Sequence, residues 1–170
     1  MNWKWQHLVA LVVVCVALLG AVLISANLLV GGAAGTSSKA TLGETALISQ
    51  LNVQRKRFGL VKLKVDPLMA TVAGAHSRDM VALNYFAHDE PGGRTYEQRV
   101  ARVHRREVAE NIAWGTGAMS AKTIVSLWMH SPEHRKIILT RVLRLIGVSI
   151  VHGRFKGNAS AVVVTAEFST

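Results

Sequence analysis

Hydrophobic positions divide this chain into one continuous apolar run and a longer region in which apolar and polar residues alternate. Residues 8–30 are apolar except at Cys15, Gly20, Ser25 and Asn27. A run of this length spans the roughly 30 Å hydrocarbon core of a bilayer as one helix. We therefore predict a transmembrane helix or signal-anchor at residues 8–30, preceded by a cytoplasmic N-terminus at residues 1–7.

The alternative for this run is a cleaved signal peptide. Small residues at positions 31–34 suit a signal peptidase, but the run exceeds the usual apolar region of about 7–15 residues, which favours an uncleaved anchor. An uncleaved anchor gives a single-pass cell-membrane protein with an extracytoplasmic C-terminal domain, whereas cleavage gives a secreted protein. Residues 31–40 are small and polar, which is typical of a flexible linker.

The region that follows begins with helical patterns. A Ser, Thr or Asp residue followed by Pro, or by Glu or Gln three positions later, is a helix-start signal. Such signals, together with apolar residues at helical spacing, predict five helices at residues 41–58, 66–84, 95–103, 120–130 and 131–139.

Strand patterns close the chain. Residues 145–151 and 160–168 alternate between apolar and polar side chains, which predicts an antiparallel hairpin joined by a loop at residues 152–158. Residues 107–114 fit a short strand or an irregular extended segment. Helices followed by an antiparallel hairpin predict an α+β domain in which the helices pack on a sheet.

The chain is strongly basic, with 20 Lys and Arg against 10 Asp and Glu and a net charge of +10. Most of these cations belong to the domain, with runs at residues 55–57 and 99–106. Such a field favours anionic partners. Because an export segment makes nucleic acid an unsuitable partner, we expect an anionic lipid or a wall polymer. The alternative is a solvated basic face that keeps the domain soluble.

Three side chains from distant parts of the sequence are candidates for a chemical site: His88, Glu110 and His134. His88 lies in a loop rich in Pro and Gly, Glu110 lies in an extended segment, and His134 lies in the first turn of a helix that begins after Ser131. A helix N-terminus disfavours imidazolium, so we expect His134 to be neutral at pH 7. Two imidazoles and one carboxylate would leave an open position for water on Zn²⁺ or a similar divalent metal.

No short spacing forces these residues together, and each has a structural alternative. His88 can bond the backbone of its own loop. Glu110 can pair with Arg105 or Arg106 at the surface. His134 can be an ordinary polar residue of a first helical turn, like Glu133. We expect the remaining histidines of the domain to be surface or structural residues: His76, His104, His130 and His152.

Four stretches of the chain resemble the bacterial, cysteine-free branch of the CAP superfamily, the cysteine-rich secretory, antigen 5 and pathogenesis-related proteins. The chain has a single cysteine, Cys15, which lies outside the domain. The stretches occur in the family's order and cover about residues 44–168. They are AHSRDM (75–80) followed by YFAHDEPGG (85–93), AENIAWG (109–115), WMHSPEHR (128–135), and IGV (146–148) with the terminal strand.

The resemblance implies an α-β-α sandwich over residues 41–170, with a cleft that carries two His and two Glu. Matched motif by motif, His88 and His134 take the two histidine positions and Glu110 takes one glutamate position. Some family members bind a divalent metal through the two histidines, and some bind lipids or sterols nearby. No single catalytic activity describes the family.

This sequence departs from the family's motifs at two places. Ala109 and Glu133 both stand where the motifs usually have Gly, and Glu133 adds a carboxylate beside His134. The second cleft glutamate has no clear counterpart, so we predict a cleft of His88, Glu110 and His134 with Glu133 at its side.

The leading hypothesis is an exported, membrane-anchored CAP domain. It would act as a binding module for an anionic or amphipathic component of the cell envelope, with a divalent metal held by His88 and His134. The alternative hypothesis is a metal-dependent extracytoplasmic hydrolase, in which Glu110 orients or deprotonates a water. The sequence does not determine the ligand or the oligomeric state.

Overall fold

The computed structural model describes residues 42–117 and 119–170. The predicted transmembrane helix at residues 8–30 and the predicted linker at residues 31–40 lie outside these residues. Within the described part of the chain, none of the helices has the length and apolar character needed to cross a membrane.

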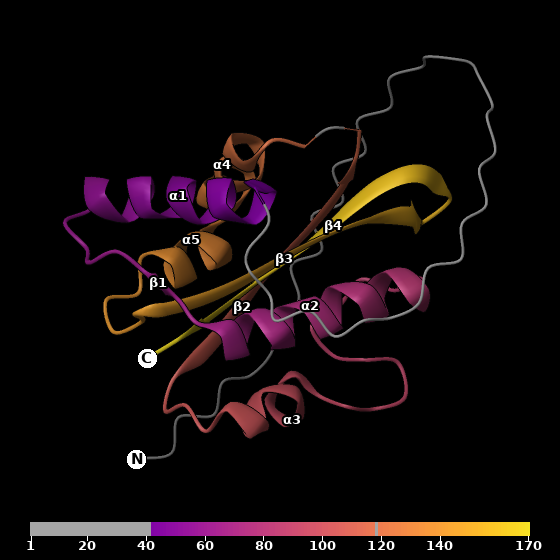
Figure 1. Ribbon diagram of the computed structural model, residues 1–170, viewed down its shortest axis with the longest axis horizontal. Coiled ribbons are helices and arrows are strands. Elements are labelled where there is room, and N and C mark those ends of the chain that lie inside the picture. Colours follow the sequence, from indigo (N-terminus) through magenta and orange to yellow (C-terminus); the bar gives the residue numbers. More distant parts are fainter. Residues whose placement is uncertain (1–41, 118) are drawn as a thin grey trace. The chain divides into compact units, whose positions relative to one another are not determined.

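A four-stranded sheet in the order β1-β3-β4-β2 forms the middle of the domain (Figure 1). The predicted hairpin is confirmed: β3 and β4 pair antiparallel at the centre of the sheet. The predicted extended segment is the edge strand β2, antiparallel to β4, and β1 pairs with β3 in parallel. The strands are β1 (Lys64–Val65), β2 (Val108–Thr116), β3 (Leu145–Phe155) and β4 (Asn158–Ser169).

The loop predicted at residues 152–158 is wrong in extent. The two strands continue to Phe155 and from Asn158, so Lys156 and Gly157 alone form the turn. Both residues have a positive φ, 48° and 82°. Two consecutive positive φ angles are the conformation of a type I′ turn, whose twist matches that of the strands it joins.

Helices cover both faces of the sheet, which confirms the predicted α-β-α layering (Figure 1). One face carries α1 (Leu42–Arg57), α4 (Ala121–His130) and α5 (Pro132–Ile138), and the other carries α2 (Pro67–Ala82) and α3 (Tyr96–Val100). The start signals of α2 and α3 act as expected. Asp66 accepts from two backbone N–H groups of α2, and Thr95 forms a complete capping box with Gln98.

Alternating side chains of the central strands build a separate core on each face. On the α1 face, Leu51, Ile124 and Trp128 pack against strand residues such as Val164 and Phe168. On the α2 face, Met80 and Tyr85 pack against Ile112, Phe155 and Val163. The α2 helix lies unusually close to β3 at Gly147, where an added Cβ would lie only 2.0 Å from the backbone nitrogen of Ala70. Only glycine permits that approach.

The basic run at residues 55–57 contains one fully buried arginine. Arg55 donates hydrogen bonds of 2.8–3.0 Å to four backbone carbonyls, those of Val61, Ile138, Thr140 and Leu143. Its guanidinium thereby joins the end of α1 to the following loop and to the turn between α5 and β3.

Candidate functional site

The edge strand β2 sends neighbouring side chains to opposite faces of the sheet, as strand geometry requires. Glu110 points to the α2 face, where it lies opposite Glu167 of β4. Asn111 points to the α5 face and donates to the backbone carbonyl of His134 at 3.2 Å. On the same strand, the Ile112 carbonyl accepts the indole N–H of Trp128 at 3.1 Å. Groups from the helical layers on both faces of the sheet therefore lie next to this edge strand.

Glu110 is buried, and both of its carboxylate oxygens are engaged. Its Oε1 accepts from His88 Nδ1 at 2.7 Å, and its Oε2 accepts from Arg99 Nη2 at 2.7 Å. His76 Nε2 lies 3.6 Å from Oε2. Burial by itself raises the pKa of Glu110, but the hydrogen bond from His88 and the positive charges around it outweigh burial and lower the pKa. At neutral pH Glu110 is therefore ionised: it accepts hydrogen bonds but is a poor base.

Arg99 links Glu110 to the loop that carries His88. Its Nη1 donates to the His88 carbonyl at 2.7 Å, and its Nε lies 3.9 Å from Glu167 Oε1. Burial raises the pKa of Glu167 well above its ordinary value, and the negative charge of Glu110 raises it further. Tyr96 has its pKa raised by burial first and then by the charges of the two carboxylates. Arg99 thus lies among two carboxyl groups and a phenol that are shielded from water.

His76 is also part of this cluster, in the structural role that was one of the two alternatives expected for it. Its Nε2 lies 3.1 Å from the Ala87 carbonyl, and its Nδ1 lies 3.3 Å from the Tyr85 hydroxyl. Burial lowers the pKa of His76, so the neutral ring is favoured. A neutral ring that donates from Nε2 to the carbonyl accepts at Nδ1 from Tyr85, which satisfies both nitrogens.

His134 lies on the other side of the edge strand, at the start of α5. Its Nδ1 is 2.7 Å from the Ser131 hydroxyl, so the Ser131 side chain contacts the His134 ring instead of capping the helix backbone. Burial lowers the pKa of His134, the charge of His88 lowers it further, and Glu133 opposes the shift. The direction agrees with the neutral imidazole expected from the sequence, but its cause is burial and a neighbouring histidine.

His88 bonds Glu110 directly, and His134 lies on the other side of the same edge strand, where the charge of His88 still lowers its pKa. We call His88, Glu110 and His134 the edge site. Glu133 is exposed on α5. The surface pairing of Glu110 with Arg105 or Arg106 is wrong: Glu110 binds the buried Arg99, while Arg105 binds Asp66 at 2.6 Å.

The chemistry of the edge site suits a two-histidine metal site better than a three-ligand one. In the described ranges 42–117 and 119–170, the structure contains no group of three His, Cys, Asp or Glu side chains able to hold a metal ion. Glu110 is already engaged by His88 and Arg99. On both His88 and His134 the contacted nitrogen is Nδ1, so Nε2 is the nitrogen through which each ring would bind a metal.

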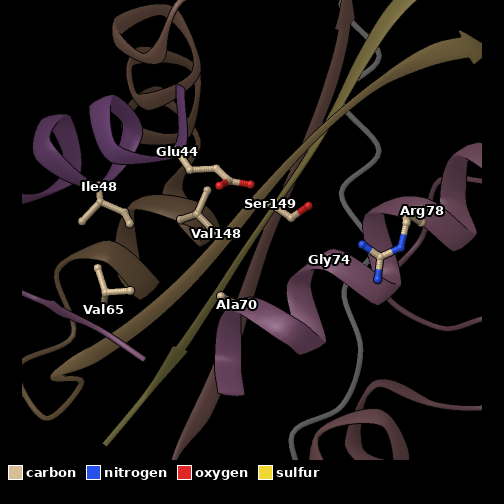
Figure 2. A pocket seen from close by; sticks show the side chains of 8 residues that line it. All are labelled: Glu44, Ile48, Val65, Ala70, Gly74, Arg78, Val148 and Ser149. Atoms are coloured by element: carbon tan, nitrogen blue, oxygen red, sulfur yellow. The ribbon is translucent and has the colours of Figure 1, made fainter. Parts of the chain in front are cut away.

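A separate cavity of about 100 Å³ lies beside β3, between α1 and α2 (Figure 2). At its α1 side Glu44 accepts from the Ile150 N–H at 3.3 Å, on the strand edge that β1 leaves uncovered. The cavity is smaller than the roughly 300–1,000 Å³ of typical ligand sites. None of the edge-site residues lines it. Its lining residues are Glu44, Ile48, Val65, Ala70, Gly74, Arg78, Val148 and Ser149.

An α-β-α domain with a histidine and glutamate site at a sheet edge is the class of protein that the motifs implied. The model of the cysteine-rich secretory protein family, CAP, matches residues 48–168, and the chain belongs to this family.

Two curated relatives from Bacillus subtilis are similar in sequence. The uncharacterized protein YkwD is 33% identical over 110 residues, which cover 64% of this chain and 42% of YkwD. The uncharacterized membrane protein YlbC is 32% identical over 112 residues, which cover 65% of this chain and 32% of YlbC. The chain therefore matches less than half the length of either relative.

Solved structures share the fold. An extracellular SCP-domain protein of Bacillus anthracis matches with a TM-score of 0.60 and 30% identity, over 75% of this chain and 40% of that one. An outer surface protein of Borrelia burgdorferi matches with a TM-score of 0.64 and 20% identity, over 80% of this chain and 99% of that one. Similar proteins are thus extracellular or membrane proteins, which is consistent with an extracytoplasmic domain.

Proposed function

We propose that this domain is an extracytoplasmic binding module for an anionic or amphipathic component of the cell envelope. Its edge site would hold a divalent metal through Nε2 of His88 and of His134. The observation that carries this proposal is that both carboxylate oxygens of Glu110 already accept a hydrogen bond, from His88 and from Arg99, each at 2.7 Å. A carboxylate held in this way orients a histidine and is not itself available as a base.

The hydrogen bond to Glu110 determines which nitrogen of His88 is free. In the neutral ring, Nδ1 carries the hydrogen that it donates to Glu110, so the lone pair is on Nε2, and the side chain is 51% exposed. A carboxylate behind a histidine in this way is a common feature of metal sites, where it fixes the tautomer and raises the ring's basicity. A bound Zn²⁺ would act as a Lewis acid that attracts phosphate or carboxylate oxygens of a ligand.

The hydrolase alternative is supported by the same His88–Glu110 pair. A histidine oriented by a buried carboxylate is the arrangement of a general base, with Nε2 as the atom that takes the proton. In that case His88 would accept a proton from water, and Glu110 would position the ring. Its lowered pKa makes Glu110 a poor base.

Zn²⁺ titration of a fragment spanning residues 37–170 tests the proposal, because every core cluster of the domain lies within that fragment. We expect His88→Ala and His134→Ala to abolish binding and Glu110→Gln to weaken it about 10–100-fold. His130→Ala is the matched control, since among the described residues this exposed ring bonds only Ser126 of its own helix. Unchanged affinity in both His88→Ala and His134→Ala would rule out the two-histidine site.

Turnover measurements separate the two functions. Fragment with and without Zn²⁺ is compared with its His88→Ala variant on ester, peptide and peptidoglycan substrates. Turnover that requires His88 would favour the hydrolase, whereas metal binding without turnover on any of these bonds would favour the binding module.

A further inference from the structure

One end of the sheet carries a dense group of exposed cations. Arg55 joins three segments there: the end of α1, the loop before β1, and the turn between α5 and β3. The Lys64 N–H also donates to the Arg144 carbonyl at 2.9 Å, which places β1 beside that turn. In Figure 1 these segments lie together at the left of the sheet. We call this surface the basic end; its exposed cations are Lys56, Arg57, Lys62, Lys64, Arg141 and Arg144.

No carboxylate forms an ion pair with these cations within the described residues, and residues 54–65 and 135–148 contain no Asp or Glu. Glu107, beside Thr170, is the exposed acidic residue at this end of the sheet. Asp66, the acidic residue nearest to β1 in sequence, binds Arg105 at 2.6 Å and caps α2. The favourable interaction of a helix C-terminus with cations accounts for Lys56 and Arg57. It does not account for the cations of β1 and the α5–β3 turn.

Large apolar side chains are exposed among these cations. Phe58 is 46% exposed, Val61 is 58% exposed and Val142 is 54% exposed. The guanidinium of Arg135 lies 4.8 Å from the centre of the Phe58 ring. These three side chains come from the same segments that Arg55 joins, so they lie at the same end of the sheet as the cations.

We propose that the basic end is a docking surface for an anionic lipid bilayer, with Phe58, Val61 and Val142 entering the headgroup region. Cations alone would suit any polyanion, but apolar side chains between them gain free energy only where they leave water. The combination of cations and exposed apolar side chains matches a membrane surface and not a hydrated polymer. The docking surface is distinct from the edge site; it needs the envelope location of the proposed function but no metal.

Co-sedimentation of the fragment spanning residues 37–170 with vesicles tests this. Wild-type fragment is expected to bind phosphatidylglycerol-containing vesicles at physiological salt and not to bind pure phosphatidylcholine. Each cation near an anionic surface strengthens binding about fivefold. The triple variant Lys62→Gln, Lys64→Gln, Arg141→Gln is therefore expected to bind about a hundredfold more weakly.

A matched control removes the same charge from the other end of the sheet. Lys122 lies in the first turn of α4, the helix that follows β2, while Arg154 and Lys156 lie at or next to the β3–β4 turn, and all three are exposed. The variant Lys122→Gln, Arg154→Gln, Lys156→Gln should bind within about threefold of wild type. An equal loss in both triple variants would show that net charge alone attracts the vesicle, and the proposal would fail.

The apolar residues give a second, independent test. Val61→Ser with Val142→Ser should weaken vesicle binding while leaving its salt dependence unchanged. Neither substitution is expected to alter binding of a soluble polyphosphate. If the double variant binds vesicles as wild type does, and polyphosphate competes fully with vesicles, the partner is a polymer and the lipid proposal is overturned. These vesicle measurements are made without added metal, so failure of the edge-site metal would be distinguishable from failure of docking.

Discussion

Arg55 and Arg99 are both buried almost completely, at 0% and 2% exposure, but they are satisfied in opposite ways. Arg55 is surrounded by neutral backbone carbonyls, whereas Arg99 binds the Glu110 carboxylate and the His88 carbonyl. The positive charge of Arg99 is therefore compensated inside the domain, and that of Arg55 is not. Burial and the nearby Arg144 lower the pKa of Arg55, but an arginine remains charged at any physiological pH.

This difference separates two regions with two roles. At the edge site, charges are paired with one another, so they hold the His88 loop and the sheet edge in place. At the basic end, a buried cation lies under a surface of further exposed cations, which solvent ions can screen and which the proposed docking would pair with anionic headgroups. The predictions below test this contrast by removing each kind of interaction in turn.

The largest expected effect is that of Arg55→Ala. The substitution leaves four backbone carbonyls without their donor, and each buried acceptor left unsatisfied costs about 1–3 kcal/mol. We expect loss of folding or a decrease in the free energy of unfolding on the order of 5 kcal/mol, measured by urea titration. Arg55→Lys cannot reach all four carbonyls and should recover only part of this. A decrease below about 1 kcal/mol for Arg55→Ala would show that water replaces the guanidinium.

Arg99→Ala is expected to have the next largest effect, because it leaves Glu110 buried without its cation. Breaking a buried pair from one side costs about 3–5 kcal/mol, whereas replacing both partners costs much less. The double variant Arg99→Met, Glu110→Gln should therefore be more stable than Arg99→Ala in the same urea titration. If the double variant is the less stable of the two, charge compensation is not what Arg99 contributes.

Stability of the edge-site region should also depend on pH. The pKa of His76 and of His134 is lowered in the folded state, so the unfolded chain binds more protons below its histidine pKa of about 6.5. The free energy of unfolding therefore decreases as the pH falls through this value. Glu110, whose pKa is also lowered, adds a further loss below about pH 4.5. Glu167 acts oppositely, because its raised pKa contributes stability at low pH that is lost as the pH rises.

Thermal melts at about pH 7.5 and about pH 5.5, on either side of the histidine pKa, measure this dependence. The melting temperature should be lower at the acidic pH, and the difference should shrink in His134→Gln. Because Glu167 opposes the histidines in this range, the comparison with His134→Gln is decisive: an equal difference in wild type and His134→Gln would contradict a lowered pKa of His134.

The smallest expected effect on stability is that of His88→Ala. The His88 side chain is half exposed, so water can replace the hydrogen bond that it donates to Glu110, and a typical hydrogen bond contributes about 0.5–1.5 kcal/mol. We expect a decrease of about 1 kcal/mol in the free energy of unfolding by urea titration, alongside complete loss of Zn²⁺ binding. A large loss of stability would instead make His88 a structural residue and weaken the case for a metal.

The three edge-site residues were predictable from motifs, but the buried residues that surround Glu110, namely Arg99 and His76, were not. The family motifs lead directly to His88, Glu110 and His134. Arg99 could not be distinguished from the other cations of its basic run. Its position four residues after Thr95 indicates a helix, but it does not indicate contact with a carboxylate on a distant strand. His76 did leave a signal: it lies seven residues after Met69 and four before Met80, which is the buried face of α2.

The fold shows the same limit. Alternation predicted β3 and β4 because a long buried strand repeats its pattern many times. β1 has only two residues, both exposed, and it exists because its backbone meets β3. A pairing that depends on a distant strand has no periodicity of its own for a sequence pattern to reveal.

The alternation of Glu110 and Asn111 along β2 has a consequence for any molecule held at the edge site. Because His88 belongs to the α2 side of the sheet and His134 to the α5 side, a ligand bound by both residues would cross-link the two helical layers. Ligand present at about one hundred times its dissociation constant would add about 2.7 kcal/mol against unfolding. Amide protons of both layers, and not only those near the ligand, would then exchange more slowly.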